Sequence, residues 1–400
     1  MFGNFGRGNF GNEMTLLAML SNVRKHLPEA EANCICPGHD EISRRFKITA
    51  FSIKEMPLEL RPGKTGPFIG LLRKIVMGVP LEVYRWIKTF QRLKRTDMLV
   101  MTGTGMLGDF GIKPFGLHYE IFKWSVIARL CRCKLLFVSV GAGPLHYRLS
   151  RWFVKGALFL ANYRSYRDNF SKEYLEGIGF DTKSDPVYPD LAFSLPEELI
   201  PPCPSSDRRR LVVGVGVMTY YNKQDIPELS ENRYHEYVDK LARCVTWLLE
   251  HQYDVRLFIG DLSYDREVIQ DLKALLKQRG TKFDEGQLLD EPAPSVEELL
   301  PQLAATDIVV ASRFHNIVFA LMLNKPVLSI SYHHKDDALM AEVGLSEYCQ
   351  DIDHLDIDRL IGQLCKLDRN AEIFAPQIRQ KTEAYRRALD EQYAQIFNSA

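Results

Sequence analysis

The 400-residue sequence has no uninterrupted run of about 18 apolar residues, the length that a membrane-spanning helix requires. It has no excess of one charge, since 51 Lys and Arg balance 51 Asp and Glu, and it contains no nucleic-acid recognition module. These absences exclude a transmembrane span and argue against a nucleic-acid partner. The eight cysteines are scattered and follow no signal peptide, a pattern typical of free thiols in a reducing cytoplasm.

Metal-ligand spacing is lacking as well. The two Cys-x-Cys pairs, Cys34/Cys36 and Cys131/Cys133, have a single intervening residue, whereas zinc sites usually have about two to four. We therefore expect no metal site and no bound cofactor.

The charge is divided unevenly along the chain. Residues 1–200 carry 28 Lys and Arg against 19 Asp and Glu (+9), and residues 201–400 carry 23 against 32 (−9). Residues 67–95 are basic and have apolar residues at helical spacing, which predicts one or two amphipathic helices. Such a stretch is suited to peripheral association with an anionic membrane. A helix that packs on a sheet with a solvated basic face is the commoner reason for this pattern.

Short apolar runs alternate with helical patterns, which is typical of an α/β fold with parallel sheets. The runs include 98–102, 134–140, 211–217, 255–260 and 308–311. The length indicates two domains, and the Pro-, Ser- and charge-rich stretch 196–210 is the expected linker. We expect domains at 1–198 and 205–372, with a helix in 373–400 that crosses back to the first domain.

The candidate site lies in 307–332, which is predicted to form a strand, a tight turn and a helix. Ser312 is expected to be the N-cap, so that Arg313 and His315 lie in the first helical turn, where free N–H groups favour an anion. The helix N-terminus should lower the pKa of His315, whereas a bound dianion should raise it, so the histidine is suited to act as a general acid. Alternatively, His315 only caps the turn and Arg313 pairs with a structural carboxylate.

The motifs resemble those of the polysaccharide pyruvyl transferase family. Five blocks carry the resemblance in family order: Gly8–Glu13, Thr102–Met106, Arg167–Ser171, Asp190–Leu195 and Ser312–His315, the last followed by Lys325-Pro326-Val327 and Tyr332–Lys335. Two positions depart from the family pattern. Asn12 stands where Asp is more frequent, and an Arg expected after the first strand of the second domain is missing, so that Lys223 is its candidate substitute.

The resemblance implies two Rossmann-like domains that face each other across a cleft in the glycosyltransferase B-type arrangement. It also implies transfer of the pyruvyl group of phosphoenolpyruvate onto two sugar hydroxyls, with ketal formation and phosphate release, in the biosynthesis of a cell-envelope polysaccharide or exopolysaccharide. The acceptor would be a sugar, a polysaccharide or a lipid-linked oligosaccharide precursor. The enzyme would be cytoplasmic or peripheral to the membrane, with phosphoenolpyruvate as co-substrate.

The residues expected to act follow from the turn and from the resemblance. His315 is the candidate general acid and base, and Arg313 is the candidate clamp for carboxylate or phosphate. The first domain is expected to hold the acceptor and the second the donor. The candidate substrate-binding residues are Ser312, Lys335, Lys223, Gly8, Asn9, Asn12, Glu13, Gly103, Gly105, Asp109, Gly141, Gly143, Arg167 and Asp168.

Two other functions remain open at this point. A glycosyltransferase that uses a nucleotide sugar would share the architecture and would release a nucleoside diphosphate. A non-catalytic glycan-binding protein would tolerate the loss of His315.

Overall fold

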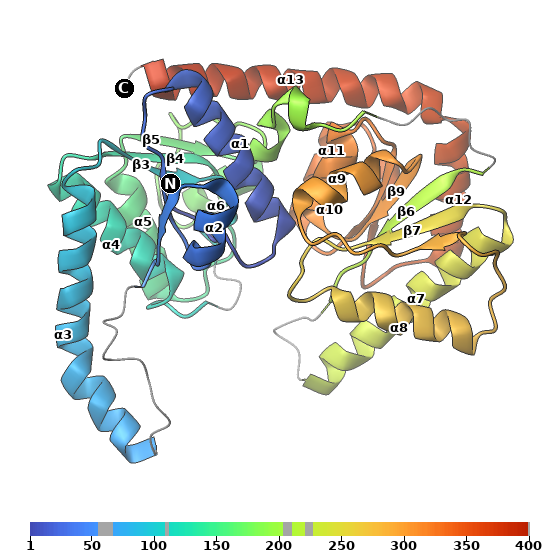
Figure 1. Ribbon diagram of the computed structural model, residues 1–400, viewed down its shortest axis with the longest axis horizontal. Helices are drawn as coiled ribbons and strands as arrows, with labels where there is room; N and C mark the ends of the chain where they lie inside the picture. Colours follow the sequence, from blue (N-terminus) through green and yellow to red (C-terminus); the bar gives the residue numbers. More distant parts are fainter. Residues whose placement is uncertain (55–66, 109–111, 203–209, 221–226, 399–400) are drawn as a thin grey trace. The chain divides into compact units, whose positions relative to one another are not determined.

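The computed structural model describes residues 1–54, 67–108, 112–202, 210–220 and 227–398 (Figure 1). The chain divides into two compact units. The first unit contains Met1–Gly6, Val23–Asp190 and the chain end from Gln395, and the second contains Arg7–Asn22 and Leu191–Ala394. Residues 7–22 therefore belong to the second unit, although the sequence placed them in the first domain.

The first unit is built on parallel strands. Phe2 forms parallel bridges to Ile35 on one side and to Met101 on the other, so this single residue stands for a central first strand. Its N–H donates to the carbonyl of Val100 at 2.8 Å. The paired strands are β1 (Asn33–Ile35) with β2 (Thr49–Phe51), and β3 (Met98–Thr102), β4 (Lys134–Val140) and β5 (Tyr163–Tyr166) in that order. The predicted strands 98–102 and 134–140 are confirmed.

Helices connect these strands because parallel neighbours need crossover connections. The helix α4 packs on β4 and between α3 and α5. Trp124 of α4, Phe137 of β4 and Tyr166 of β5 are fully buried members of the core. The helices are α2 (His39–Phe46), α3 (Pro67–Leu93), α4 (Leu117–Leu130), α5 (Arg148–Phe159) and α6 (Asn169–Gly177), with α1 (Phe10–His26) shared between the units.

The second unit holds a six-stranded parallel sheet in the order β11-β10-β9-β6-β7-β8. The first strand along the chain, β6, is therefore central, and the strand order reverses between β6 and β9. In open α/β sheets, ligands bind at the carboxyl ends of the strands beside such a reversal. The strands are β6 (Val212–Gly216), β7 (Asp254–Phe258), β8 (Leu288–Leu289), β9 (Ile308–Ala311), β10 (Val327–Ser331) and β11 (Cys349–Asp351).

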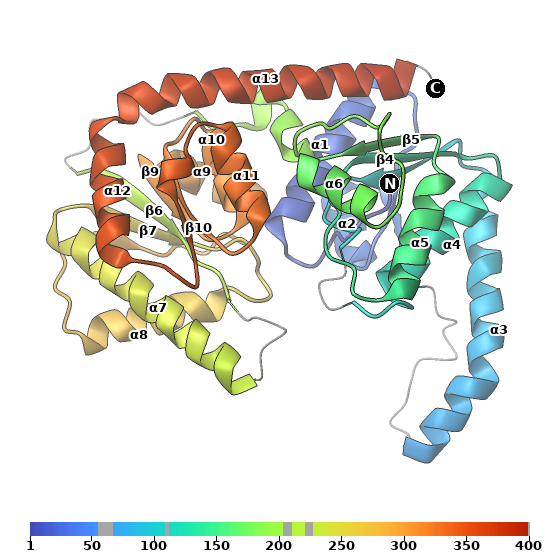
Figure 2. The same cartoon turned by 180° about the vertical axis from the view of Figure 1, so that it is seen from behind.

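Helices cover both faces of this sheet, with α9, α10 and α11 on one face and α7 and α8 on the other (Figures 1 and 2). His334 begins α11, and His333 Nδ1 caps this helix by accepting from the Lys335 N–H. The helices are α7 (Pro227–Glu250), α8 (Arg266–Gln278), α9 (Val296–Ala304), α10 (Phe314–Met322), α11 (His334–Glu342), α12 (Ile357–Arg369) and α13 (Ala371–Asn398); 3-10 turns lie at Leu191–Ser194, Glu197–Leu199 and Ser346–Tyr348.

A helix does form at the chain end, as predicted, but α13 begins at Ala371, two residues before the expected start, and contains Pro376. Its residues up to Ala394 belong to the second unit and those from Gln395 to the first. In the part of the chain that the structure describes, no helix is both long and apolar enough to cross a membrane.

Candidate active site

The loops that follow β6, β7 and β9 come together at the carboxyl edge of the second unit's sheet, beside the reversal of strand order. The backbone N–H of Ser312, directly after β9, donates to the carbonyl of Gly216 at the end of β6. The N–H of Val217 donates to the carbonyl of Phe258 at the end of β7. The strand order thus predicts a ligand site here, and the sequence independently placed Arg313 and His315 at this turn.

Arg313 pairs with a buried carboxylate. Its Nε donates to Asp265 Oδ2 at 3.0 Å and its Nη2 donates to Asp265 Oδ1, so the planar fork of the guanidinium is matched by both carboxylate oxygens. Asp265 is fully buried, whereas the Arg313 side chain is 20% exposed. Two of the guanidinium nitrogens are therefore committed within the protein, as in the structural alternative that the sequence left open.

Asp265 also holds the neighbouring loops in place. It accepts hydrogen bonds from the backbone N–H groups of Thr219 at 2.9 Å, Gly260 at 3.2 Å and Asp261 at 3.0 Å. Burial lowers the pKa of Arg313, but the charge and hydrogen bonds of Asp265 raise it above its ordinary value. Arg313 therefore keeps its charge, and the hydrogen bonds to Asp265 fix this positively charged group at the sheet edge.

The N-terminal turn joins this site from the opposite end of the sequence. Asn9 Nδ2 donates to Asp261 Oδ2 at 3.0 Å, while Asn9 Oδ1 accepts from the N–H of Asn12 at 3.1 Å and so caps α1. The Phe10 N–H donates to the carbonyl of Gly260. Gly8 has φ +76 and lies against Leu262, so a larger residue there would be strained as well as crowded.

Gly11 lies directly against the imidazole of His315. A Cβ placed on Gly11 would lie 1.9 Å from His315 Nδ1, closer than any real contact, so the ring requires glycine at this position. His315 is the second residue of α10 and so lies in the first helical turn, as predicted. The rings of Phe314 and Phe319 lie 5.1 and 6.1 Å from it. Two blocks about 300 residues apart in the sequence therefore build one site.

Two carboxyl groups lie beside this turn. Burial raises the pKa of Asp261, and the hydrogen bonds from Asn9 and Ser263 and the charge of Arg313 only partly oppose this effect. Glu13, in the first turn of α1, is 1% exposed. Asp261 is therefore an acid that holds its proton to higher pH than an ordinary aspartate.

The sequence reasoning missed Asn316. This residue is fully buried, and neither Nδ2 nor Oδ1 of its amide has a hydrogen-bond partner within the described chain. A Cβ on Gly216 would lie 2.8 Å from Nδ2, and one on Gly260 would lie 3.3 Å from Oδ1, so the amide occupies the space between the ends of β6 and β7. The sequence signal that could have found it was an amide in the first turn of a helix whose other residues, apart from His315, are apolar.

The remaining expected residues of this unit lie close to the turn. Ser312 is not the N-cap of α10, since Arg313 holds that position without a side-chain cap; instead, the Ser312 hydroxyl accepts from Tyr237 at 2.7 Å. The Lys335 ammonium lies 5.0 Å from the ring centre of Phe314 and donates to the Tyr332 hydroxyl at 3.2 Å. Lys223 lies outside the described residues.

The expected residues of the first unit form a separate group at the ends of β3, β4 and β5. Gly103 and Gly105 follow β3, and Gly141 and Gly143 follow β4. A Cβ on Gly141 would lie 2.6 Å from Arg167 Nε, so the guanidinium lies over the glycine backbone. Asp168 caps α6 through the Ser171 N–H at 2.6 Å and lies 3.3 Å from Arg167 Nε. Asp109 lies outside the described residues.

Within the described residues, no group of three or more His, Cys, Asp and Glu side chains is arranged to hold a metal ion, and the cysteines are free thiols.

A known protein family matches most of the chain. The model of the polysaccharide pyruvyl transferase family matches residues 9–334, which include the N-terminal turn and the Arg313–His315 turn. No curated protein matches the chain.

Solved structures show the fold. The Anabaena protein HepE, in complex with UDP and glucose, is 14% identical with a TM-score of 0.61, over 100% of this chain and 98% of that one. A putative UDP-N-acetylglucosamine 2-epimerase from Listeria monocytogenes is 14% identical with a TM-score of 0.60, over 99% and 96% of the two chains. The architecture is thus that of the glycosyltransferase B-type α/β proteins. With the family match over most of its length, the chain belongs to the polysaccharide pyruvyl transferase family.

Proposed function

We propose that the protein transfers the pyruvyl group of phosphoenolpyruvate to two hydroxyls of a sugar and releases phosphate. The observation that carries the proposal is the meeting of Gly11 and His315, because it unites two blocks of a pyruvyl transferase chain around one titratable side chain. The acceptor is a sugar unit of a polysaccharide or of its lipid-linked precursor.

The proposed chemistry needs one group that donates and accepts a proton and two nucleophiles, which are the two sugar hydroxyls. Protonation of the methylene carbon of phosphoenolpyruvate makes the adjacent carbon electrophilic, and a sugar hydroxyl attacks that carbon. The group that donated the proton takes up the proton of the first hydroxyl. The second hydroxyl closes the ring as the carbon–oxygen bond to phosphate breaks, and its proton leaves with the phosphate. We assign the proton transfer to His315, because the backbone of Gly11 and the ring of Phe314 fix its imidazole at the start of α10.

The anion would be bound by Arg313 and by the N-terminus of α10. Asp265 already binds Nε and Nη2 of Arg313, so we assign Nη1 to the carboxylate or phosphate of the donor. Asp265 then acts as a positioning residue, since it holds the guanidinium without needing to touch substrate. The buried amide of Asn316 is assigned to ligand binding at the same edge.

The acceptor is assigned to the first unit, where Arg167 lies over Gly141. Gly103 follows the neighbouring strand β3, and Gly143 follows β4 as Gly141 does. This assignment keeps the donor on the second unit, as the sequence predicted. A sugar acceptor presents hydroxyl groups, which suit the backbone amides of glycine turns and a fixed guanidinium.

The experiment incubates the full chain with phosphoenolpyruvate and a panel of glycosides and follows phosphate release together with a product mass increased by one pyruvate ketal. We expect phosphate and product in equal amounts, and only when an acceptor is present. Release of a nucleoside diphosphate from a sugar nucleotide, with phosphoenolpyruvate untouched, would replace the proposal by glycosyl transfer. Glycan binding without turnover would indicate a non-catalytic protein.

Variants test the site itself. His315→Ala should lower kcat by about two to four orders of magnitude and leave phosphoenolpyruvate binding nearly unchanged. Gly11→Ala should also lower kcat, because the added methyl group displaces the imidazole. Gly362→Ala is the matched control, since its Cβ would meet nothing within 4 Å and lies in the same unit. Full activity in His315→Ala would exclude the assigned role.

A further inference from the structure

The helix α3 of the first unit exposes an apolar stripe. Val79, Val83, Ile87 and Phe90 recur at helical spacing and are 71, 53, 51 and 46% exposed. A helix that only packed on the sheet would bury such a stripe. The residues Gly78, Val79, Glu82, Val83, Trp86 and Ile87 line an apolar groove of about 510 Å³ along the helix.

Polar contacts from another face of α3 hold this helix against α4. Glu82 accepts hydrogen bonds from Tyr119 at 2.9 Å and from the buried Lys123 at 3.1 Å, and both of these residues belong to α4. The indole of Trp86 donates to the Tyr119 hydroxyl at 3.0 Å. The helix is thus fixed in rotation, and the stripe lies beside its attached face.

The helix α5 exposes a second face of the same character. Arg148, Trp152, Lys155 and Phe159 recur at helical spacing, and Trp152 and Phe159 are 56 and 79% exposed. Cations that alternate with large aromatic side chains are typical of surfaces that lie at the headgroup level of a bilayer.

Ring contacts join the two faces through α4. Tyr119, which binds Trp86 of α3, lies 5.4 Å from the ring of Phe153 on α5. Phe115, itself 66% exposed, lies 5.8 Å from Tyr119 and 5.9 Å from Phe153. Trp152 lies 5.4 Å from Phe153. The exposed side chains therefore belong to one connected surface, which we call the α3–α5 face.

The two helical stretches that carry this surface have almost only positive charges. Residues 78–95 carry five cations and one acid, Glu82, and residues 148–159 carry three cations and no acid. The cations are Arg85, Lys88, Arg92, Lys94 and Arg95 in the first stretch and Arg148, Arg151 and Lys155 in the second. Cations beside exposed apolar groups complement a surface of anionic headgroups over acyl chains.

We propose that the α3–α5 face binds the surface of an anionic lipid bilayer, with the apolar side chains at the acyl boundary and the cations at the headgroups. The inference is independent of the reaction proposed above, because none of these residues belongs to the candidate site. It gives the basic residues of the first half of the chain a specific partner.

Vesicle flotation tests the proposal on the full chain. Vesicles of phosphatidylcholine alone are compared with vesicles that also contain phosphatidylglycerol, at low and high salt. We expect the protein to float with the anionic vesicles, and this fraction should fall as salt rises. The double variant Ile87→Gln with Phe90→Gln should lose most of the binding. Lys94→Gln with Arg148→Gln should weaken it about fivefold for each cation removed.

The matched control is Lys282→Gln with Phe283→Gln, a neighbouring cation and aromatic residue exposed on the second unit. It should float like the parent protein, and circular dichroism should show all variants folded. Equal flotation of the α3 variant and the parent would overturn the proposal, as would no flotation of the parent. A parent dimer that becomes monomeric in the α3 variant, with no vesicle binding, would assign the face to self-association instead.

Discussion

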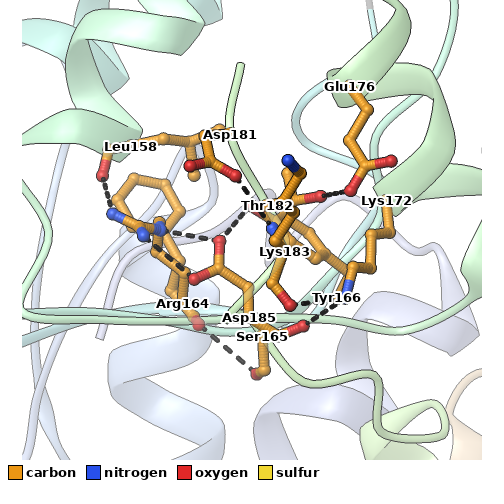
Figure 3. A network of polar contacts seen from close by, with 11 residues as sticks. Leu158, Arg164, Ser165, Tyr166, Lys172, Glu176, Asp181, Thr182, Lys183 and Asp185 are labelled. Carbon is orange, nitrogen blue, oxygen red and sulfur yellow. Dashed lines mark hydrogen bonds and ion pairs between the residues drawn. The ribbon is translucent and has the colours of Figure 1, made fainter.

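Each unit contains a buried arginine–aspartate pair in which Nε and Nη2 of the arginine donate to the two carboxylate oxygens. The two pairs have different surroundings. In the first unit, Arg164 donates to Asp185 at 2.8 and 2.9 Å (Figure 3). In the second unit, Arg313 donates to Asp265 in the same way. The difference between them separates a structural pair from one that borders a site.

The first pair lies in a network of polar groups that are hydrogen-bonded to one another. Arg164 also donates through Nη1 to the carbonyl of Leu158, and the Tyr166 hydroxyl donates to Asp185 at 3.0 Å (Figure 3). Lys172 donates to the Asp185 carbonyl at 2.8 Å. The hydrogen bonds that Arg164 donates to Asp185 raise the pKa of Arg164. This network connects β5 to the segment around Asp185.

The second pair borders polar and titratable groups of the candidate site. Asn316 is buried without a partner in the described chain, the pKa of Asp261 is raised, and Gly11 leaves just enough space for His315. Buried polar groups are normally satisfied, so an orphaned amide beside a charged pair requires a reason. The pair itself is therefore a poor marker of function, whereas its neighbours are informative.

The largest expected effect comes from removing the two aspartates. Asp265→Ala leaves the guanidinium of Arg313 without its carboxylate and should lower the free energy of unfolding by about 3–5 kcal/mol. Asp185→Ala should also destabilise strongly, although Arg164 keeps its bond to Leu158. Urea denaturation measures both changes.

Turnover per folded molecule separates the two variants. Asp265→Ala should lower kcat about 10²-fold, because Arg313 and the Gly260 loop shift, whereas Asp185→Ala should keep the parent value. Loss of turnover in Asp185→Ala alone would reverse the comparison. Asp265→Asn, which preserves the shape of the side chain, provides a second measurement if the alanine variant does not fold.

Much of the fold could be predicted from local pattern. The strands at 98–102, 134–140 and 308–311 were found because apolar runs of this length with glycine or charged residues after them are typical of buried parallel strands. His315 was placed in the first turn of α10 for the same reason. These predictions depend only on residues that are neighbours in sequence.

Contacts between distant segments could not be predicted. From the sequence, Arg313 could bind either a ligand or a structural carboxylate. Only the packing of the loop after β7 places Asp265, 48 residues away, against the guanidinium. The glycines of residues 8–11 suggested a turn, but their assignment to the second unit depends on Asn9 bonding to Asp261. Asn316 was missed because burial without a partner is a property of the folded state.

A smaller effect should distinguish two buried amides. Asn316→Leu removes an unsatisfied amide and should raise the free energy of unfolding by about 1 kcal/mol while it lowers turnover. Asn22→Leu should do the opposite to stability, because the Asn22 amide donates to the carbonyls of Ala18 at 2.9 Å and Ser194 at 3.2 Å. Thermal unfolding and steady-state kinetics measure both. Destabilisation by Asn316→Leu with unchanged turnover would make Asn316 a structural residue.

The smallest expected effect is a dependence of folding stability on pH, which has opposite signs for two carboxyl groups. Burial raises the pKa of Asp261 above 3.8, so its contribution to stability is fully present below that pH and is lost as pH rises through the folded pKa. Asp261→Asn removes this loss, and the Tm of the variant minus that of the parent should rise with pH.

The pKa of Glu82 in the first unit is lowered, because Lys123 and the hydrogen bonds to Glu82 outweigh the effect of burial. Its contribution is present above the unfolded value of 4.5 and is lost as pH falls, so the same difference for Glu82→Gln should become more negative as pH rises. Tm values from below pH 3.8 to neutral measure both slopes, and slopes of equal sign would show that Asp261 is an ordinary paired carboxylate.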